Sequence, residues 1–254
     1  MTCIKYDAPA ANALLDVLEF MTANPVSWGP TELARRLEQS SNMTFRVLNV
    51  LTERGYVEKN ENGNYHLTAA LFSLGMKMQH NFDLRSQARP HLEELAALCG
   101  ESAQLQIPDG DRMLQVDHVP PPTPYYLVVT PGCRVHWHGN AFGKAVWAFL
   151  PREQQEKLFT LPREQLTIHT ITDEKLLRKE LSDIRITLCA AEYEEYLEGC
   201  YCLAAPVFNT LGEIVAAVGI SGVISRLKKE NLPELQKQVS ACAGKISRSI
   251  GFKE

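Results

Sequence analysis

The first 70 residues of this chain contain three short helical patterns, each ended by a helix-breaking residue, and this order limits the fold more than any other feature. Apolar residues recur at helical spacing over 10–22, and the pairs Asn24-Pro25 and Gly29-Pro30 end that pattern. Thr31 is placed to cap a second helix over 32–37. The opening of the chain is therefore predicted to be helical.

A third helix, from about Ser41 to Arg54, follows a polar turn at 38–40. Gly55 then stands where a left-handed residue commonly ends a helix. Two short strands, 56–59 and 65–67, flank a turn rich in Asn and predict a hairpin. We assign the apolar face of the third helix to Phe45, Val47, Leu48, Val50 and Leu51. Helix, helix-turn-helix and hairpin form the order of a winged helix-turn-helix.

In DNA binding, the helix that begins at Ser41 would enter the major groove with its N-terminal residues at base edges. The positions expected to contact bases or phosphates are Arg35, Arg36, Ser41, Asn42, Met43, Thr44, Arg46 and Lys59. Charge does not support this interpretation, because residues 1–70 carry six Lys and Arg against eight Asp and Glu. From spacing alone, a bundle that packs against another protein stays open as the alternative.

The second half of the chain alternates between strand and helix patterns. Strands are expected at 103–107, 113–119, 125–130, 202–208 and 214–220, and helices at 140–150, 151–159, 173–190 and 233–250. The chain is therefore predicted to be α+β, with a mixed sheet in its second half. We divide it into a DNA-binding domain over 8–68, a linker helix over 69–82 and a further domain over 83–254. The acids at 192–198 are expected to be a solvated surface, apart from Glu192.

Composition argues against several classes of protein. The sequence contains no run of 18 apolar residues, the length that a membrane span needs. The first nine residues also lack the basic-then-apolar order of a secretory signal, so we expect a cytoplasmic protein. The seven scattered cysteines suit reduced thiols better than a disulfide framework. No hydrolase, phosphate-binding or metalloprotease motif is present, so we expect no enzyme, no catalytic residue and no cofactor.

One chemical alternative depends on a group of soft side chains: His118, His136, His138, Cys200 and Cys202. His-x-His and Cys-x-Cys place alternate side chains on one strand face, which could supply metal ligands. Cys202 beside a histidine could also be drawn as a nucleophile and its base. We expect neither, because such residues more often line a pocket or pack in a core. A metal-dependent or thiol enzyme is the alternative that this group leaves open.

Six segments resemble the IclR-type regulators, named for the isocitrate-lyase regulator. They are TELARRL at 31–37, LTERGYV at 51–57, YHL at 65–67, GNAFGKA at 139–145, GCYCLAAPVF at 199–208 and ISG at 220–222. The resemblance runs from about Ala10 to Ile250 in the family's order, so it is far more specific than any one motif.

This resemblance implies a winged helix-turn-helix, a linker helix and a GAF-like effector-binding domain, and hence a ligand-responsive regulator of a metabolic operon. It implies a homodimer or homotetramer on a near-palindromic double-stranded operator. By resemblance the ligand contacts fall on Ala141 and Phe142, through their backbone, and on Glu192, Cys202, Gly219 and Ser221. The family contains both repressors and activators, so neither sign of control is implied.

Three positions depart from the family's pattern. Asn42 stands where many relatives have Lys, which changes the expected operator sequence rather than the activity. Gly219 stands where some acid-sensing relatives have Ser, and Phe142 is bulkier than the usual small residue. With Trp137 close by, these residues predict a pocket for a planar, carboxylate-bearing molecule, which backbone N–H groups at the start of a helix would suit. Phe142 could equally fill part of the pocket and select a smaller ligand.

Overall fold

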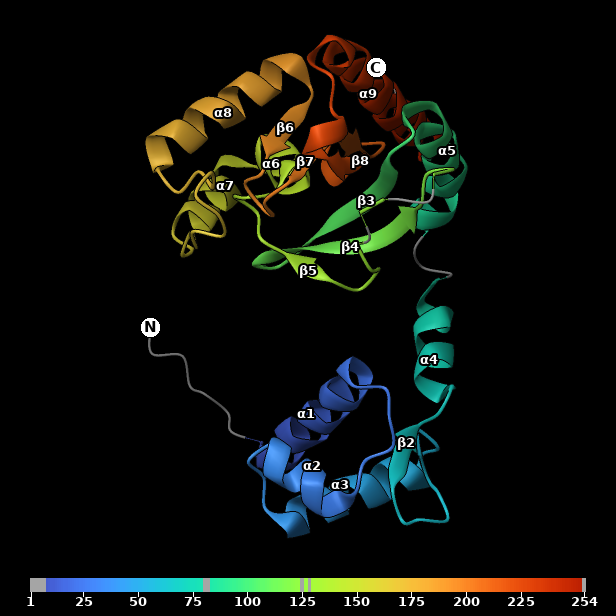
Figure 1. Ribbon diagram of the computed structural model, residues 1–254. Coiled ribbons are helices and arrows are strands. Elements are labelled where there is room, and N and C mark those ends of the chain that lie inside the picture. Colours follow the sequence, from blue (N-terminus) through green and yellow to red (C-terminus); the bar gives the residue numbers. More distant parts are fainter. Residues whose placement is uncertain (1–7, 80–82, 124–125, 128, 253–254) are drawn as a thin grey trace. The chain divides into compact units, whose positions relative to one another are not determined.

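The computed structural model describes residues 8–79, 83–123, 126–127 and 129–252. Contacts divide the chain into two compact units, Met1–Asn81 and Phe82–Glu254, whose elements are labelled in Figure 1. The first unit has one hydrophobic core, and the second has one core on each face of its sheet. No helix within the described ranges is long and apolar enough to cross a membrane.

The first unit is a small helical bundle with a two-stranded hairpin. Its elements are α1 (Pro9–Ala23), α2 (Pro30–Arg36), α3 (Ser41–Glu53), β1 (Val57–Lys59), β2 (Tyr65–Leu67) and α4 (Ala70–Gln79). Helices α1, α2 and α3 meet at Val17, Leu33 and Leu48, which are fully buried. Tyr65 exchanges two backbone hydrogen bonds of 2.8 Å with Trp28, so the hairpin is tied to the loop before α2. This is the predicted winged helix-turn-helix.

Two local predictions for this unit are wrong. Thr31 does not cap α2, because the helix begins at Pro30 and no side chain caps it. A proline at this first position has no N–H that needs a partner. Phe45 and Val50 are not in the core either, since they are 48% and 40% exposed. They flank the buried stripe of Thr44, Val47, Leu48 and Leu51, one on each edge, where the helical repeat places them.

The second unit is a six-stranded sheet with helices on both faces. Its helices are α5 (Asp83–Cys99), α6 (Ala141–Trp147), α7 (Arg152–Phe159), α8 (Glu174–Thr187) and α9 (Leu232–Ser249), and its strands are β3 (Ser102–Asp109), β4 (Arg112–Val119), β5 (Arg134–Val135), β6 (Ala190–Tyr193), β7 (Cys200–Phe208) and β8 (Ile214–Val223). The strand order is β5-β4-β3-β8-β7-β6. All its described pairings are antiparallel, where the sequence suggested a mixed sheet, because the hairpins β3–β4 and β7–β8 meet side by side at the centre.

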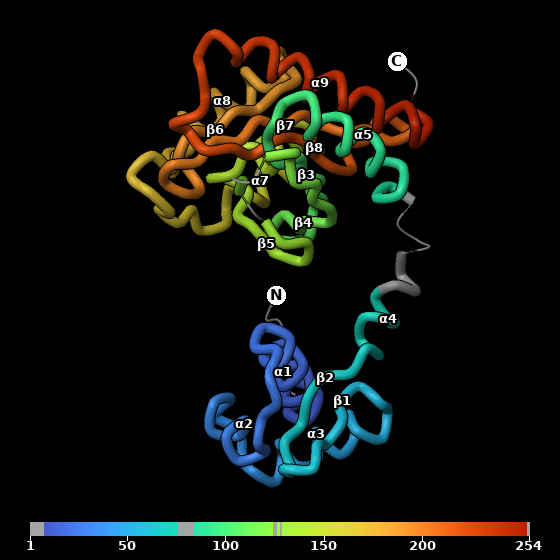
Figure 2. Tube along the Cα trace, turned by 45° about the vertical axis from the view of Figure 1, so that its right-hand side comes forward, coloured from blue at the N-terminus to red at the C-terminus, as the bar shows by residue number. Residues whose placement is uncertain are grey.

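Side chains alternate between the two faces of this sheet. Leu105, Leu203 and Val218 point to the face covered by α5 and α9, which lie side by side in Figures 1 and 2. Ala204 and Ala217 point to the other face, in the core that includes α6. Small residues on this second face let α6 approach the sheet closely, and its position there shapes the cavity described below.

The strand pattern misjudged three segments. The strand predicted at 125–130 is not formed by Tyr126, Leu127 or residues 129–130, and residues 124, 125 and 128 lie outside the described part of the chain. Strands β5 and β6 lie at the edges of the sheet and were missed. The helix predicted through 190 ends earlier because Leu188 is left-handed, with a φ of 54°. Glycine usually occupies that position, so the sequence carried no stop signal.

Candidate DNA interface and ligand cavity

The exposed face of α3 depends on where that helix begins. The Ser40 hydroxyl accepts a hydrogen bond of 3.2 Å from the Met43 backbone N–H and so caps the helix. Over the first nine residues of α3 the exposed positions then follow the helical repeat: Ser41, Asn42, Phe45, Arg46 and Asn49. This face carries a hydroxyl, two amides, an aromatic ring and a guanidinium, and such groups bind base edges, thymine methyl groups and phosphates.

Two of the residues predicted to contact DNA do not share this face. Thr44 is fully buried, and its hydroxyl donates to Gln39 Oε1 at 3.3 Å, so it supports the turn between α2 and α3 instead. Met43 is half-buried and packs against the core. Phe45 and Asn49 are surface residues that the sequence analysis missed. Counting in steps of four along the helix from its first residues would have found both.

Two arginines lie in the last turn of α2. The guanidinium groups of Arg35 and Arg36 lie 3.9 and 3.8 Å from the Glu32 carboxylate, and their side chains are 71% and 52% exposed. Long ion pairs at such exposed positions contribute little to stability. A phosphate can therefore replace Glu32 as their partner at little cost.

The hairpin β1–β2 forms the wing, and its tip is a well-defined turn. Asn60 Oδ1 accepts hydrogen bonds from the backbone N–H groups of Asn62 and Asn64 at 3.1 and 3.0 Å. Gly63 has a φ of 81°, a conformation that favours glycine. Lys59 lies at the base of the tip, with its ammonium 5.6 Å from the centre of the Tyr65 ring. The wing thus presents a cation next to a fixed turn.

In the second unit, a cavity of about 250 Å³ lies between the sheet and the start of α6. Its lining comes from five strands, helix α6 and three connecting segments: Gln104, Gln106, Leu127, Val129, Thr130, Cys133, Val135, Asn140, Phe142, Glu192, Tyr196, Leu197, Cys200, Cys202 and Ser221. Apolar and thiol groups with a few amides and hydroxyls are typical of sites for small organic molecules. Among these described lining residues, none is Lys, Arg or His.

Four of the six residues that the resemblance assigned to the ligand line this cavity: Phe142, Glu192, Cys202 and Ser221. Ala141 and Gly219 are buried but are not among the lining residues. A Cβ atom at Gly219 would collide with the Leu203 carbonyl oxygen and lie 2.8 Å from Ala204 Cα. A serine at this position would therefore force β7 and β8 apart.

The start of α6 is already capped from within the protein. Asn140 Oδ1 accepts a hydrogen bond of 3.2 Å from the Phe142 backbone N–H, and Asn140 Nδ2 donates to Gln106 Oε1 at 2.8 Å. The Phe142 N–H, expected to be available to a ligand carboxylate, is therefore paired. This Asn-Gln pair also fixes the amide of Gln106 on the cavity wall.

Glu192 is the one carboxyl group among the described lining residues, and its side chain is 1% exposed. Its Oε2 accepts a hydrogen bond of 2.9 Å from the Glu195 backbone N–H, whereas its Oε1 has no hydrogen-bond partner. Burial raises the pKa of Glu192 to about 7, although the Cys202 thiol and the Glu195 N–H each lower it. Near neutral pH this carboxyl group is therefore divided between its neutral and ionised forms.

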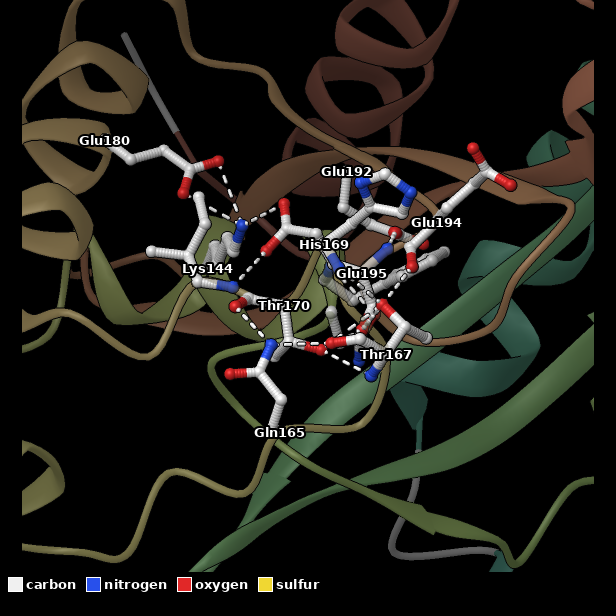
Figure 3. A network of polar contacts seen from close by, with 12 residues as sticks. Lys144, Gln165, Thr167, His169, Thr170, Glu180, Glu192, Glu194 and Glu195 are labelled. Atoms are coloured by element: carbon white, nitrogen blue, oxygen red, sulfur yellow. Dashed lines mark hydrogen bonds and ion pairs between the residues drawn. The ribbon is translucent and has the colours of Figure 1, made fainter.

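A buried ion cluster lies behind Glu192 (Figure 3). Lys144 is fully buried, and its Nζ lies 2.6 Å from Glu195 Oε1 and 2.8 Å from Glu180 Oε2. The second Glu195 oxygen accepts the Ile171 backbone N–H at 3.3 Å. The cluster joins α6, α8 and the loop after β6. This cluster is not predicted from the sequence, because the acidic run at 192–198 predicts a solvated surface for Glu195 and nothing local marks Lys144 as buried.

Within the described part of the chain, the cysteine and histidine side chains singled out in the sequence form no reactive centre. Cys202 Sγ lies 3.0 Å from Ser221 Oγ, and burial raises the pKa of this thiol well above its usual value, which disfavours the nucleophilic thiolate. His136 and His138 pack edge to face with ring centres 5.5 Å apart. Among the described residues, no group of three or more His, Cys, Asp or Glu side chains could hold a metal ion. The geometry gives the enzyme alternative no support.

A winged helix-turn-helix with an exposed recognition face, in one chain with an α+β unit that encloses a small-molecule cavity, defines a ligand-responsive DNA-binding regulator. Sequence comparison agrees: residues 13–61 match the IclR helix-turn-helix domain, and residues 76–248 match the bacterial transcriptional regulator IclR C-terminal domain. The chain belongs to the IclR family of transcriptional regulators, and it is a regulator rather than an enzyme.

Individual relatives support this family assignment. The chain is 31% identical over 228 residues to the HTH-type transcriptional regulator KdgR of Dickeya chrysanthemi, covering 89% of this chain and 75% of that protein. The crystal structure of the Thermotoga maritima IclR has a TM-score of 0.82 at 28% identity and covers 95% of this chain and 98% of its own. An IclR homologue from Microbacterium hydrocarbonoxydans, solved in complex with 4-hydroxybenzoate, shares the fold with a TM-score of 0.82 at 19% identity, covering 95% and 98%.

Proposed function

We propose that this regulator reads a near-palindromic operator through paired copies of α3, and that an organic acid in the cavity changes its affinity for that DNA. The single observation that carries the DNA contact is the exposed face of α3, which displays unpaired polar groups beside a buried core face. We assign base contacts to Ser41, Asn42 and Arg46, and phosphate contacts to Arg35, Arg36 and Lys59. Met43 keeps a place at the edge of that face, and buried Thr44 is withdrawn from it.

A homodimer or homotetramer is the assembly that this proposal requires, because two half-sites need two recognition helices related by symmetry. We keep 8–68, 69–82 and 83–254 as the proposed DNA-binding, linker and effector-binding segments. Effector binding that favours one arrangement of these segments would shift operator affinity by about 1–3 kcal/mol, the usual range of such couplings.

The effector is proposed to be a planar aromatic acid from the pathway that the operon encodes. The cavity supports this class, because apolar side chains and thiols surround a few isolated polar groups. The 4-hydroxybenzoate complex of the Microbacterium homologue is an example of such a ligand on the same fold. Thermal-shift screening of the full-length protein against benzoate, 4-hydroxybenzoate and aliphatic acids tests the class. Stabilisation by aliphatic acids alone would contradict it.

The DNA proposal is tested by a gel shift with the protein's own upstream region and an unrelated duplex of equal length. We expect Arg46→Ala to weaken specific binding roughly 10-fold or more, the range for loss of one good base or phosphate contact. Arg54→Ala is the matched control, because Arg54 is also an exposed arginine and lies at the C-cap of the same helix, far from its first turn. Equal losses in both variants, or no preference for the upstream fragment, would refute the proposed docking.

A further inference from the structure

Two residues that line the cavity hold buried polar atoms without a partner. By distance and angle, Glu192 Oε1 and Gln104 Nε2 make no hydrogen bond to the described residues, although each residue is only 1% exposed. The Cys202 thiol, which lowers the pKa of Glu192, lies 3.0 Å from Ser221 Oγ. Buried polar atoms in folded proteins are nearly always paired, so each exception requires an explanation. Two such atoms around one cavity indicate that a ligand supplies the missing partners.

The two atoms have complementary chemistry. In the ionised form of Glu192 the free oxygen accepts a hydrogen bond, whereas the free amide nitrogen of Gln104 can only donate one. Four other polar residues of the lining are paired with one another, since Asn140 binds Gln106 and the Cys202 thiol binds Ser221. A ligand that pairs both atoms therefore needs a hydrogen-bond donor near Glu192 and an acceptor near Gln104.

The two positions are far apart on the sheet. Gln104 lies on β3 and Glu192 on β6, and strands β8 and β7 run between them. Three interstrand steps correspond to roughly 14 Å along the sheet. Both side chains face α6, because they share their face with Ala204 and Cys202 through the strand register. A short acid cannot reach both, so the ligand must be elongated, with an apolar middle that contacts Phe142.

Charge decides which end of the ligand lies at Glu192. A carboxylate placed beside the ionised form of Glu192 would face a like charge without a cation, because no described lining residue is basic and the ammonium of Lys144 is held by Glu180 and Glu195. The ionised form of Glu192 therefore favours the hydroxyl end of the ligand at this position. The thiols of Cys200 and Cys202 and the phenol of Tyr196 are the other titratable groups of the lining at this end, and none of them is cationic.

We propose that the effector is a hydroxylated aromatic acid whose hydroxyl group donates to Glu192 Oε1 and whose carboxylate accepts from Gln104 Nε2. This inference rests on the proposed effector function of the same cavity. In this arrangement Glu192 selects ligands that carry a hydroxyl group on the ring, and Gln104 selects ligands that carry a carboxylate.

Calorimetry on the full-length protein tests the donor at Glu192 with four para-substituted benzoates. The 4-hydroxy and 4-amino compounds carry a donor, whereas the 4-fluoro and 4-methoxy compounds do not. We expect both donors to bind roughly 10-fold or more tightly than 4-fluorobenzoate, the effect of one buried hydrogen bond to a charged or polar group. Equal affinity for the four compounds would overturn the inference without any variant.

Two variants then assign the ends of the ligand. Glu192→Met should abolish the preference for 4-hydroxy over 4-fluorobenzoate, while Gln104→Leu should weaken both by roughly 10-fold and preserve that preference. The reverse pattern would show the opposite orientation and refute the assignment. Absence of binding by every probe, with the gel shift on the upstream fragment intact, would refute the ligand and leave the DNA-binding function standing. Loss of that gel shift would count against the proposed function instead.

Discussion

Replacing Lys144 by Met isolates the contribution of the buried ion cluster. The ammonium lies between the Glu195 and Glu180 carboxylates at 2.6 and 2.8 Å, and these two acid side chains are only 8% and 23% exposed. Without Lys144 they would remain close together with little water to solvate them. Breaking such a buried pair costs about 3–5 kcal/mol. In a domain of this size, that predicts a melting temperature lower by roughly 6–20 °C.

Differential scanning calorimetry of the full-length protein at pH 7 measures this loss. Lys157→Met is the matched control, because Lys157 is an exposed lysine on α7 and should melt like the wild type. Burial raises the pKa of Glu180 even with Lys144 in place. Protonation of Glu180 should therefore shrink the deficit of Lys144→Met as the pH falls. Adding Glu180→Gln and Glu195→Gln should restore most of the stability, since neutral amides need no counter-ion. A Lys144→Met protein that melts within about 2 °C of the wild type, a shift of 1 kcal/mol or less, would refute the reasoning.

Three further predictions concern other buried groups. Because the pKa of Glu192 is raised to about 7, the free energy of unfolding of the wild type should fall by roughly 3 kcal/mol as the pH rises from about 5 to 8. Glu192→Gln should not show this fall. Urea titrations across that pH range measure both proteins, and parallel pH profiles would contradict the assignment. Arg89→Met removes a 3.0 Å ion pair from the buried Asp117 carboxylate and should cost about 1–3 kcal/mol in urea unfolding, more than Arg85→Met, whose contact is 3.5 Å. Gly219→Ala should cost about 1–3 kcal/mol in the same assay, because its Cβ would meet the Leu203 carbonyl, whereas Gly75→Ala, with nothing within 4 Å, should be neutral or mildly stabilising.

The winged helix-turn-helix could be predicted because its signals are local. Pro30, Gly55 and the apolar repeat of α3 each act within a few residues, so the order of elements follows without knowledge of tertiary contacts. The exposed Phe45 shows the limit of that method, since an aromatic residue in a helix is usually buried, and only the three-helix packing shows which side of α3 faces out. The early end of α8 at Leu188 has the same origin, because a left-handed leucine is held by its surroundings rather than by its own preference.

The candidate cavity was only partly predictable. Resemblance pointed to Glu192, Cys202 and Ser221, which do line it, but it gave no indication that the Phe142 N–H is already used by Asn140. Gln104 was missed because an isolated glutamine on a strand has no signature. Its burial and its unpaired amide depend on the neighbouring strands. Pairing and burial of polar groups are properties of the assembled sheet, and a single sequence does not contain them in readable form.

The separation of the charged cluster from the cavity affects how the ligand preference of this domain can evolve. Lys144 and its two acids are bound to one another and leave the lining itself free of permanent charge, apart from the titrating Glu192. A substitution of one lining residue, such as Thr130 or Leu197, therefore alters the shape or polarity of the cavity without leaving a buried charge unpaired. The domain can acquire a new chemical preference by single substitutions while the ionic support of α6 and α8 stays intact.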